Sequence, residues 1–303
     1  MDEILIALRA QPLELKALIL GIVEGLTEFL PISSTGHLII VGSVLGFDDE
    51  RAKVFDIAIQ TGAVSSIVWL YRRRFRDALG PALRPRVWLQ FFRSREHRAD
   101  LTAAERFLPN LFLAFLPAAF LGLLFGGAIK AVLFNPVWVA SALVAGGFII
   151  LWVERLQARA PETVRIASVD EVGPLDALKI GLAQAFALIP GTSRSGATIV
   201  GGMLFGFSRQ AATEFSFFLA VPTLFAAAAY SVLRQWHLLN ADDLGLFLIG
   251  TVSSFFVALL VVRWLLRFVS SHTLNGFAYY RIVFGLLVLV SWQFDWLDWA
   301  SAD

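Results

Sequence analysis

Apolar side chains recur along this chain in long continuous runs, not in the every-second-residue alternation of half-buried strands. Six runs are long enough to cross a bilayer as helices, since a spanning helix needs about 20 apolar residues. They lie at 54–71, 107–126, 131–153, 211–232, 243–266 and 277–294. The pattern predicts an all-α polytopic membrane protein that forms a single membrane domain over residues 1–303.

Two further apolar stretches, 14–47 and 175–207, are interrupted midway by proline, glycine and hydroxyl residues. The interruptions read PISSTGH at 31–37 and PGTSRSG at 190–196. A backbone break at membrane depth is tolerated only where it is buried in protein or lines a water-filled cavity. We therefore expect each stretch to form a re-entrant helical hairpin with its polar cluster at the tip.

The two interrupted stretches also resemble each other, which indicates an internal repeat. Residues 17–21 (ALILG) parallel 177–181 (ALKIG), and Ser34 falls opposite Ser193. Repeat one would cover about 14–153 and repeat two about 175–297, each with one hairpin plus three transmembrane helices. Three crossings are an odd number, so the second repeat is predicted to have inverted topology, and the hairpin tips could then meet within the membrane.

The charged residues predict an orientation. Positively charged loops stay on the cytoplasmic side of a membrane, so the Arg-rich segment 72–106 is expected to be a cytoplasmic loop attracted to anionic lipid. The acidic tail after residue 294 is then expected outside. The arginines of this loop are Arg72, Arg73, Arg74, Arg76, Arg84, Arg86, Arg93, Arg95, Arg98 and Arg106.

Composition excludes several classes of function. Hydrophobic residues make up 57% of the chain and the net charge is only +1, which argues against a nucleic-acid partner because such a surface needs concentrated basic residues. The chain has no cysteine, so disulfides, thiolate catalysis and sulfur-ligated metals are excluded. Any metal must take oxygen or nitrogen ligands.

The first polar cluster is preceded by two acids. Glu24 and Glu28 lie four residues apart, so both carboxylates share one helix face and repel each other. Such a pair either shares a proton or holds a divalent cation, and hard oxygen ligands suit Mg²⁺ or Ca²⁺. The alternative is a pair of acids that face a water-filled vestibule or an arginine.

Hydroxyls and an imidazole follow these acids. His37 lies three residues after Ser34, which gives a nucleophile with a candidate general base. Ser33, Ser34 and Thr35 could instead cap the helix that continues through His37. The histidine could equally be a hydrogen-bonded structural residue.

The second cluster suits an anion. Ser193, Arg194, Ser195 and Thr198 lie at the start of a returning helix, where exposed amides, hydroxyls and a guanidinium can hold a phosphate. Arg194 could also be a counter-ion to Glu24 or Glu28. Together, the two clusters contain the groups that phosphoryl transfer needs.

Residues 24–37 (EGLTEFLPISSTGH) and 190–198 (PGTSRSGAT) resemble the two signature motifs of the bacterial undecaprenyl-diphosphate phosphatase family, the bacitracin-resistance type. The likeness runs through the whole chain in length, hydropathy and motif order, including 55–62 (FDIAIQTG).

The resemblance implies a hydrolase of the bacterial inner membrane. Its expected reaction converts undecaprenyl diphosphate to the monophosphate carrier used for peptidoglycan and other envelope polymers, with a divalent cation required and bacitracin resistance as a consequence. The expected partners are the polyprenyl diphosphate and membrane lipids. A homodimer is one of the oligomeric states left open.

The resemblance also implies roles for single residues. The acid pair falls on Glu24 and Glu28, and the essential serine and histidine fall on Ser34 and His37. The family's second-motif residues fall on Ser193, Arg194 and Thr198. Apart from the resemblance, we also expect Ser33, Thr35 and Ser195 to bind the phosphate. The nucleophile remains open among Ser34, His37 and water. The rival function is a lipid-phosphate flippase or secondary transporter, because inverted repeats with broken helices also build transporters.

Overall fold

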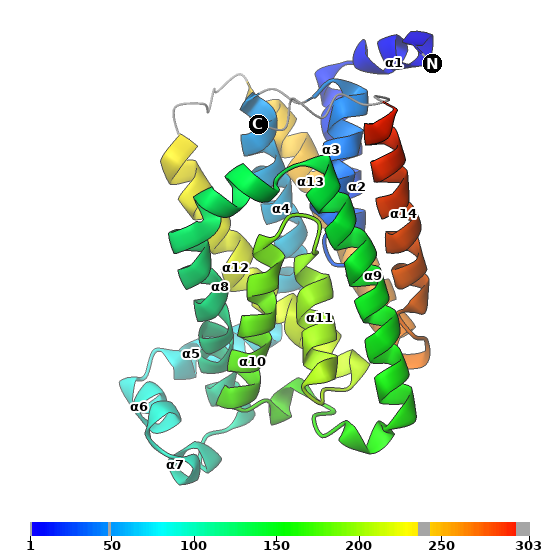
Figure 1. Ribbon diagram of the computed structural model, residues 1–303. Helices are drawn as coiled ribbons and strands as arrows, with labels where there is room; N and C mark the ends of the chain where they lie inside the picture. Colours follow the sequence, from blue (N-terminus) through cyan, green and yellow to red (C-terminus); the bar gives the residue numbers. More distant parts are fainter. Residues whose placement is uncertain (1, 48–49, 236–242, 295–303) are drawn as a thin grey trace.

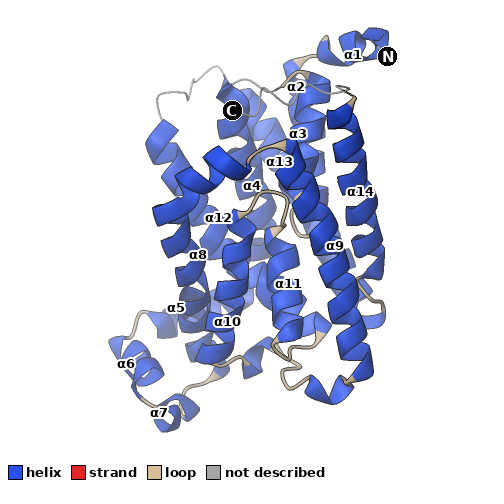
Figure 2. Cartoon of the chain, in the orientation of Figure 1, coloured by secondary structure: helices blue, strands red, loops and turns tan. Residues whose placement is uncertain are grey.

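The structure is a computed structural model that describes residues 2–47, 50–235 and 243–294. This part of the chain is built of helices and connecting loops, without strands (Figure 2), so the all-α expectation is confirmed. The helices are α1 Asp2–Arg9, α2 Leu13–Thr27, α3 Ser34–Leu45, α4 Glu50–Leu70, α5 Arg72–Ala82, α6 Pro85–Arg93, α7 Arg95–Ala99, α8 Ala103–Leu133, α9 Pro136–Arg159, α10 Pro174–Ala185, α11 Arg194–Leu204, α12 Arg209–Gln235, α13 Leu244–Ser271 and α14 Asn275–Gln293, with 3₁₀ turns η1 Pro161–Thr163, η2 Val169–Glu171 and η3 Phe186–Leu188.

Five of these helices, α8, α9, α12, α13 and α14, are long and apolar enough to cross a membrane. A sixth, α4, passes the same test together with α5, from which it is bent by 84° at Tyr71. The protein is therefore a multi-pass membrane protein, and each predicted span falls on one of these six helices.

Some predicted boundaries are wrong. A break between two spans was expected at 127–130, but α8 continues through Gly126 and Gly127 to Leu133. The chain breaks instead at Asn135, whose side-chain oxygen accepts a hydrogen bond from the backbone N–H of Trp138 (3.1 Å) and so caps α9. The predicted loop 72–106 is largely helical, and two of its helices bury apolar residues, Ala78 in α5 and Val87 and Phe91 in α6.

Both interrupted stretches form a helix, a loop and a second helix, as predicted. The first consists of α2 and α3, and the second of α10, η3 and α11. Figure 1 shows α2 starting at the upper end of the molecule and α10 at the lower end, with both connecting loops turning near mid-height. Two chain segments far apart in sequence thereby bring their polar clusters to the middle of the bundle.

Small residues let the helices around these loops approach closely. α13 packs along α2 and α4, α8 packs along α10, and α14 packs along α9. A Cβ added at Gly21 would lie 2.4 Å from the carbonyl oxygen of Gly250, and one at Gly62 would lie 2.2 Å from that of Thr251. Membrane helices associate through such close contacts because lipid offers no hydrophobic driving force between them. The tight packing fixes the face of α2 that carries the acids.

Candidate active site

Each loop places a serine in an unusual backbone conformation just before its second helix. Ser33 and Ser193 both have φ of 72°, the left-handed region that residues with a Cβ rarely adopt. Such a residue costs about 1–3 kcal/mol and tends to occur at functional sites. Each is also the N-cap of the following helix, so Ser33 is the structural counterpart of Ser193, and the pairing of Ser34 with Ser193 expected from sequence is off by one residue.

Glu28 connects the two loops. Its Oε2 accepts a hydrogen bond from the Ser34 hydroxyl at 2.6 Å, and its Oε1 accepts one from Arg194 Nη2 at 3.0 Å. The carboxylate is buried and the guanidinium is largely enclosed, with side-chain exposures of 6% and 10%. The carboxylate thus accepts two hydrogen bonds, and both are charge-assisted because Glu28 is the ionised acceptor. Arg194 is thus the counter-ion of Glu28, one of the two roles expected from sequence.

Glu24 lies one helical turn before Glu28 and is fully buried. Neither of its carboxylate oxygens has a hydrogen-bond partner among the residues that the structure describes. Glu28 and Asp56 add negative charge around it, and Arg194 supplies the positive charge. Uncompensated buried carboxylates are costly, so this arrangement fits a bound cation.

The geometry restricts how such a cation could be held. Within residues 2–47, 50–235 and 243–294, no group of three or more His, Cys, Asp or Glu side chains comes together as a metal site. Two carboxylates suffice for Mg²⁺, which commonly keeps waters and takes its other ligands from substrate phosphates. Glu24 and Glu28 therefore fit a cation that binds with a phosphate substrate.

His37 does not contact Ser34 in the way the sequence spacing suggested. Its Nδ1 donates to the Ser33 carbonyl oxygen at 2.7 Å, because a carbonyl can only accept. Its Nε2 lies 2.6 Å from the Tyr280 hydroxyl, and its ring stacks on Phe284 with centroids 4.1 Å apart. His37 holds the backbone of the residue before Ser34, and the Ser34 hydroxyl faces Glu28.

The second loop is built around Arg194. Its Nη1 donates to the Ser216 carbonyl oxygen at 2.9 Å. The Thr198 hydroxyl donates to the Arg194 carbonyl (2.9 Å) and lies 2.6 Å from the Ser216 hydroxyl. The Ser195 hydroxyl donates to the Leu30 carbonyl of the first loop at 2.8 Å. Ser195 and Thr198 are fully buried, so they support the loops and do not face open space.

A cavity of about 160 Å³ lies between the loops. Whole small-molecule pockets measure about 300–1,000 Å³, so this space suits a head group and not a complete lipid. The predicted residues that line it are Glu28, Ser33, Ser34, Thr35, Ser193 and Arg194. Glu24, His37, Ser195 and Thr198 are not among its lining residues.

Arg281 of α14 is the main residue that the sequence analysis missed. It is 1% exposed and donates to the carbonyls of Pro31 (3.1 Å), Thr192 (2.9 Å) and Gly191 (3.2 Å), which belong to both loops. It also donates to the carbonyls of Ala142 and Leu143 in α9. An arginine inside the last apolar span was the signal that could have identified it. Gln60, which lines the cavity, and Asp56 interrupt the first span in the same way.

Comparisons with known proteins show the family to which this chain is similar. The family model described as "Bacitracin resistance protein BacA" matches residues 17–287. The undecaprenyl-diphosphatase of Dechloromonas aromatica is 57% identical over 95% of this chain and 97% of its own length. The proteins of the same name from Albidiferax ferrireducens and Herminiimonas arsenicoxydans are 55% and 56% identical over 95% of this chain and 98% and 99% of theirs.

Proposed function

The chain belongs to the bacitracin resistance protein BacA family, and we propose that it hydrolyses undecaprenyl diphosphate to undecaprenyl monophosphate and inorganic phosphate. The observation that carries the proposal is Glu28, which accepts hydrogen bonds from the Ser34 hydroxyl of one loop and Arg194 of the other. A nucleophile (Ser34), its proton acceptor (Glu28) and a phosphate-binding guanidinium (Arg194) thus meet at one cavity. Recycling of the lipid carrier for cell-wall synthesis, and resistance to bacitracin, follow from this reaction.

The contacts favour an order of events. The diphosphate enters the cavity and draws Arg194 onto its terminal phosphate, which leaves Glu28 free to take the Ser34 proton. The Ser34 oxygen attacks the terminal phosphorus, the bond to the bridging oxygen breaks, and the monophosphate leaves. Glu28 passes the Ser34 proton to the leaving phosphate oxygen. Water then attacks the phosphorus and gives a proton to Glu28, the bond from phosphorus to the Ser34 oxygen breaks, and Glu28 returns the proton to that oxygen, so inorganic phosphate leaves and the hydroxyl is restored. Arg194 and the loop amides stabilise the charge on the transferring group.

A divalent cation completes the proposed site. Glu24 and Glu28 would hold it, and its chemistry is to neutralise phosphate oxygens that the carboxylates would otherwise repel. The support is the buried Glu24 carboxylate, which lacks a donor among the described residues and lies near two further acids, Glu28 and Asp56, and one arginine, Arg194.

We further propose that the bundle consists of two inverted repeats with re-entrant hairpins, α2–α3 and α10–α11, in the bacterial inner membrane. In the order of the two repeats, α2 corresponds to α10, and α8 corresponds to α13. The contact of α2 with α13 is therefore equivalent to the contact of α10 with α8, and the structure contains both. The opposite entry directions of α2 and α10 in Figure 1 support the same arrangement. The polyprenyl tail of the substrate would remain among membrane lipids.

The test is phosphate release from undecaprenyl diphosphate by purified protein in detergent with Mg²⁺. We expect Ser34→Ala to lose at least about 100-fold in turnover, the scale of a lost proton-transfer step. The matched control is Ser254→Ala, which removes another buried hydroxyl, bonded to the Ile59 carbonyl (2.8 Å), and should retain activity. Full turnover by Ser34→Ala would exclude the serine route. Lipid translocation in vesicles without any phosphate release would favour a flippase.

A further inference from the structure

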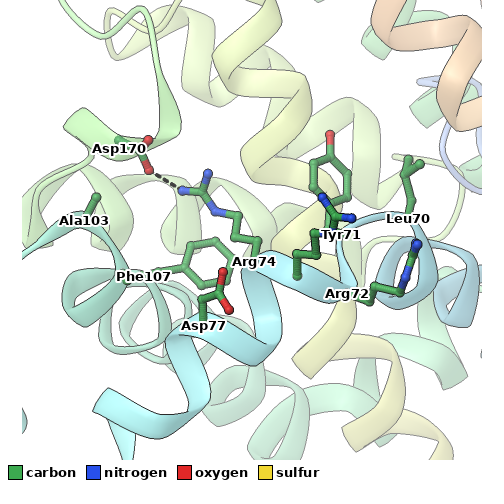
Figure 3. A pocket seen from close by; sticks show the side chains of 10 residues that line it. Leu70, Tyr71, Arg72, Arg74, Asp77, Ala103, Phe107 and Asp170 are labelled. Carbon is green, nitrogen blue, oxygen red and sulfur yellow. Dashed lines mark hydrogen bonds and ion pairs between the residues drawn. The ribbon is translucent and has the colours of Figure 1, made fainter.

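A second and larger cavity lies away from the candidate active site, between α5 and α8. Its volume is about 660 Å³, and its lining includes Leu70, Arg72, Arg73, Arg74, Phe107 and Asp170 (Figure 3). Its lining includes none of the residues assigned above to phosphoryl transfer. The volume lies within the range of about 300–1,000 Å³ typical of small-molecule sites.

The cavity lies at the end of the bundle where a membrane interface is expected. The apolar helix α4 stops at Leu70, and α5 leaves it at 84°, so that α5 runs across the lower end of the molecule in Figure 1. The adjoining α5–α6 segment exposes Leu83 (77%), Leu89 (71%) and Phe92 (56%). Large apolar side chains beside arginines are typical of a surface in the head-group region of a bilayer.

Arg74 forms a fixed wall of the cavity. It reaches from α5 to Asp170 and pairs with it, as Figure 3 shows. Its guanidinium carbon also lies 4.6 Å from the ring centroid of Phe107 and 5.2 Å from that of Phe218. Its Nε is buried and has no hydrogen-bond acceptor in the described part of the chain. Because this Nε is enclosed by protein atoms, Arg74 contributes its positive charge to the cavity and not a free donor.

The remaining charges leave the cavity cationic. Asp170 is engaged by Arg74, and Asp77 is paired with Arg76. Arg72 donates to the Trp69 carbonyl (3.0 Å), and neither Arg72 nor Arg73 has a carboxylate partner within residues 2–47, 50–235 and 243–294. Both line the cavity, next to the apolar side chains of Leu70 and Phe107.

We propose that this cavity binds the phosphate group of an anionic phospholipid from the leaflet at this end of the bundle. The exposed Arg72 and Arg73 would contact the phosphate through charge-assisted hydrogen bonds, and Arg74 would add its positive charge. Leu70 and Phe107 would pack against the apolar part of the same lipid. A free phosphate lacks that apolar part, and a zwitterionic lipid lacks the net negative charge that the arginines select. The site is separate from catalysis.

The experiment is native mass spectrometry of the full chain in detergent, titrated with phosphatidylglycerol or with phosphatidylcholine. We expect Arg72→Gln combined with Arg73→Gln to weaken binding of the first phosphatidylglycerol at least tenfold. The matched control is Arg84→Gln combined with Arg93→Gln, which removes two exposed charges of the neighbouring segment outside the cavity lining and should change this affinity less than twofold. Phosphate release should be the same in both double variants, so a failure of the lipid-binding proposal can be told apart from a failure of the phosphatase proposal.

Three results would overturn the proposal. An equal loss of phosphatidylglycerol affinity in both double variants would indicate diffuse attraction to basic residues and not a defined binding site. Equal affinity for phosphatidylcholine would exclude recognition of net charge. If inorganic phosphate displaced the bound lipid at the same concentration as competing phosphatidylglycerol does, the apolar part of the lipid would contribute nothing to binding.

Discussion

Glu24 is a buried acid whose carboxylate has no hydrogen-bond donor in the described part of the chain and lies near other acids. It is completely buried, no described residue donates to it, and two other acids lie near. Glu28, one turn away, has two donors. The two acids of the predicted pair therefore differ, because Glu28 positions side chains of both loops whereas Glu24 offers free ligand oxygens.

Replacing Glu24 tests its role in cation binding separately from the positioning role of Glu28. Glu24→Gln should raise the Mg²⁺ concentration for half-maximal phosphate release by about tenfold or more, since an oxygen ligand loses its charge. It should not lower the melting temperature, because an unpaired buried carboxylate is removed. The measurement is a Mg²⁺ titration of turnover together with thermal unfolding in detergent. Glu14→Gln, an exposed acid of the same helix, is the control, and an unchanged Mg²⁺ requirement in Glu24→Gln would contradict the cation site.

The residue types of the site were predictable from sequence, but several contacts were not. Acids one turn apart and two polar clusters in apolar stretches are local patterns. The contact of Ser34 with Glu28 and that of His37 with Tyr280 depend on how α2, α3 and α14 turn relative to one another. The left-handed conformation of Ser33 is also set by tertiary contacts, since serine has no intrinsic preference for it.

Among the helices, α14 has an unexpected part in the site. Its Arg281 bonds the backbone carbonyls of both loops and of α9, and so fixes the two tips relative to each other. The span itself was predictable from hydropathy, whereas the partners of its arginine were not, because they come from three distant segments of the chain.

Removal of this arginine should therefore destabilise the protein. Arg281→Met leaves buried carbonyls without donors, at a cost of about 3–5 kcal/mol, and should lower the melting temperature by about 10 °C. Arg263→Met, which replaces an exposed arginine of α13, should change it little. Thermal unfolding in detergent measures both, and a melting temperature for Arg281→Met within about 2 °C of wild type would show that the carbonyls have other donors.

Helix packing gives a second stability prediction. Gly62→Ala places a Cβ 2.2 Å from the Thr251 carbonyl oxygen, so α4 and α13 must separate, whereas Gly126→Ala meets nothing within 4 Å. We expect Gly62→Ala to lose at least about 1 kcal/mol, in the range of overpacking, and Gly126→Ala to be neutral or slightly stabilising, because alanine favours helix. The same thermal assay checks both. Equal melting temperatures for the two variants would contradict the close packing of α4 on α13.

For the molecule as a whole, the arginine-rich helices, the end of α9 and the start of α10 lie at one end of the bundle (Figure 1). Hydropathy was enough to predict the five helices that can each cross a membrane and the apolar part of α4, and the arginines predict that this end is cytoplasmic. The acidic tail expected on the other side, and residues 295–297 of repeat two, lie outside the described residues. The sharp bend after α4 was not predictable, because the apolar run ends at Leu70 whichever direction the chain then takes.

The orientation can be tested because the chain contains no cysteine. A cysteine introduced by Arg93→Cys in α6 should resist a membrane-impermeant maleimide in intact cells and react after the membrane is opened. One introduced by Ala10→Cys, at the opposite end beside α1, should react in intact cells. The reverse pattern would place the arginine-rich end outside.

The most direct test of a single phosphatase site shared by both loops is phosphate release from undecaprenyl diphosphate by wild type, Glu28→Gln and Arg194→Gln, each with Mg²⁺ and with a chelator. We expect turnover in wild type that the chelator abolishes. Each variant should lose about 100-fold or more, the scale of one removed charge-stabilising group. Full activity in Arg194→Gln, or bound lipid without phosphate release in wild type, would contradict the shared site.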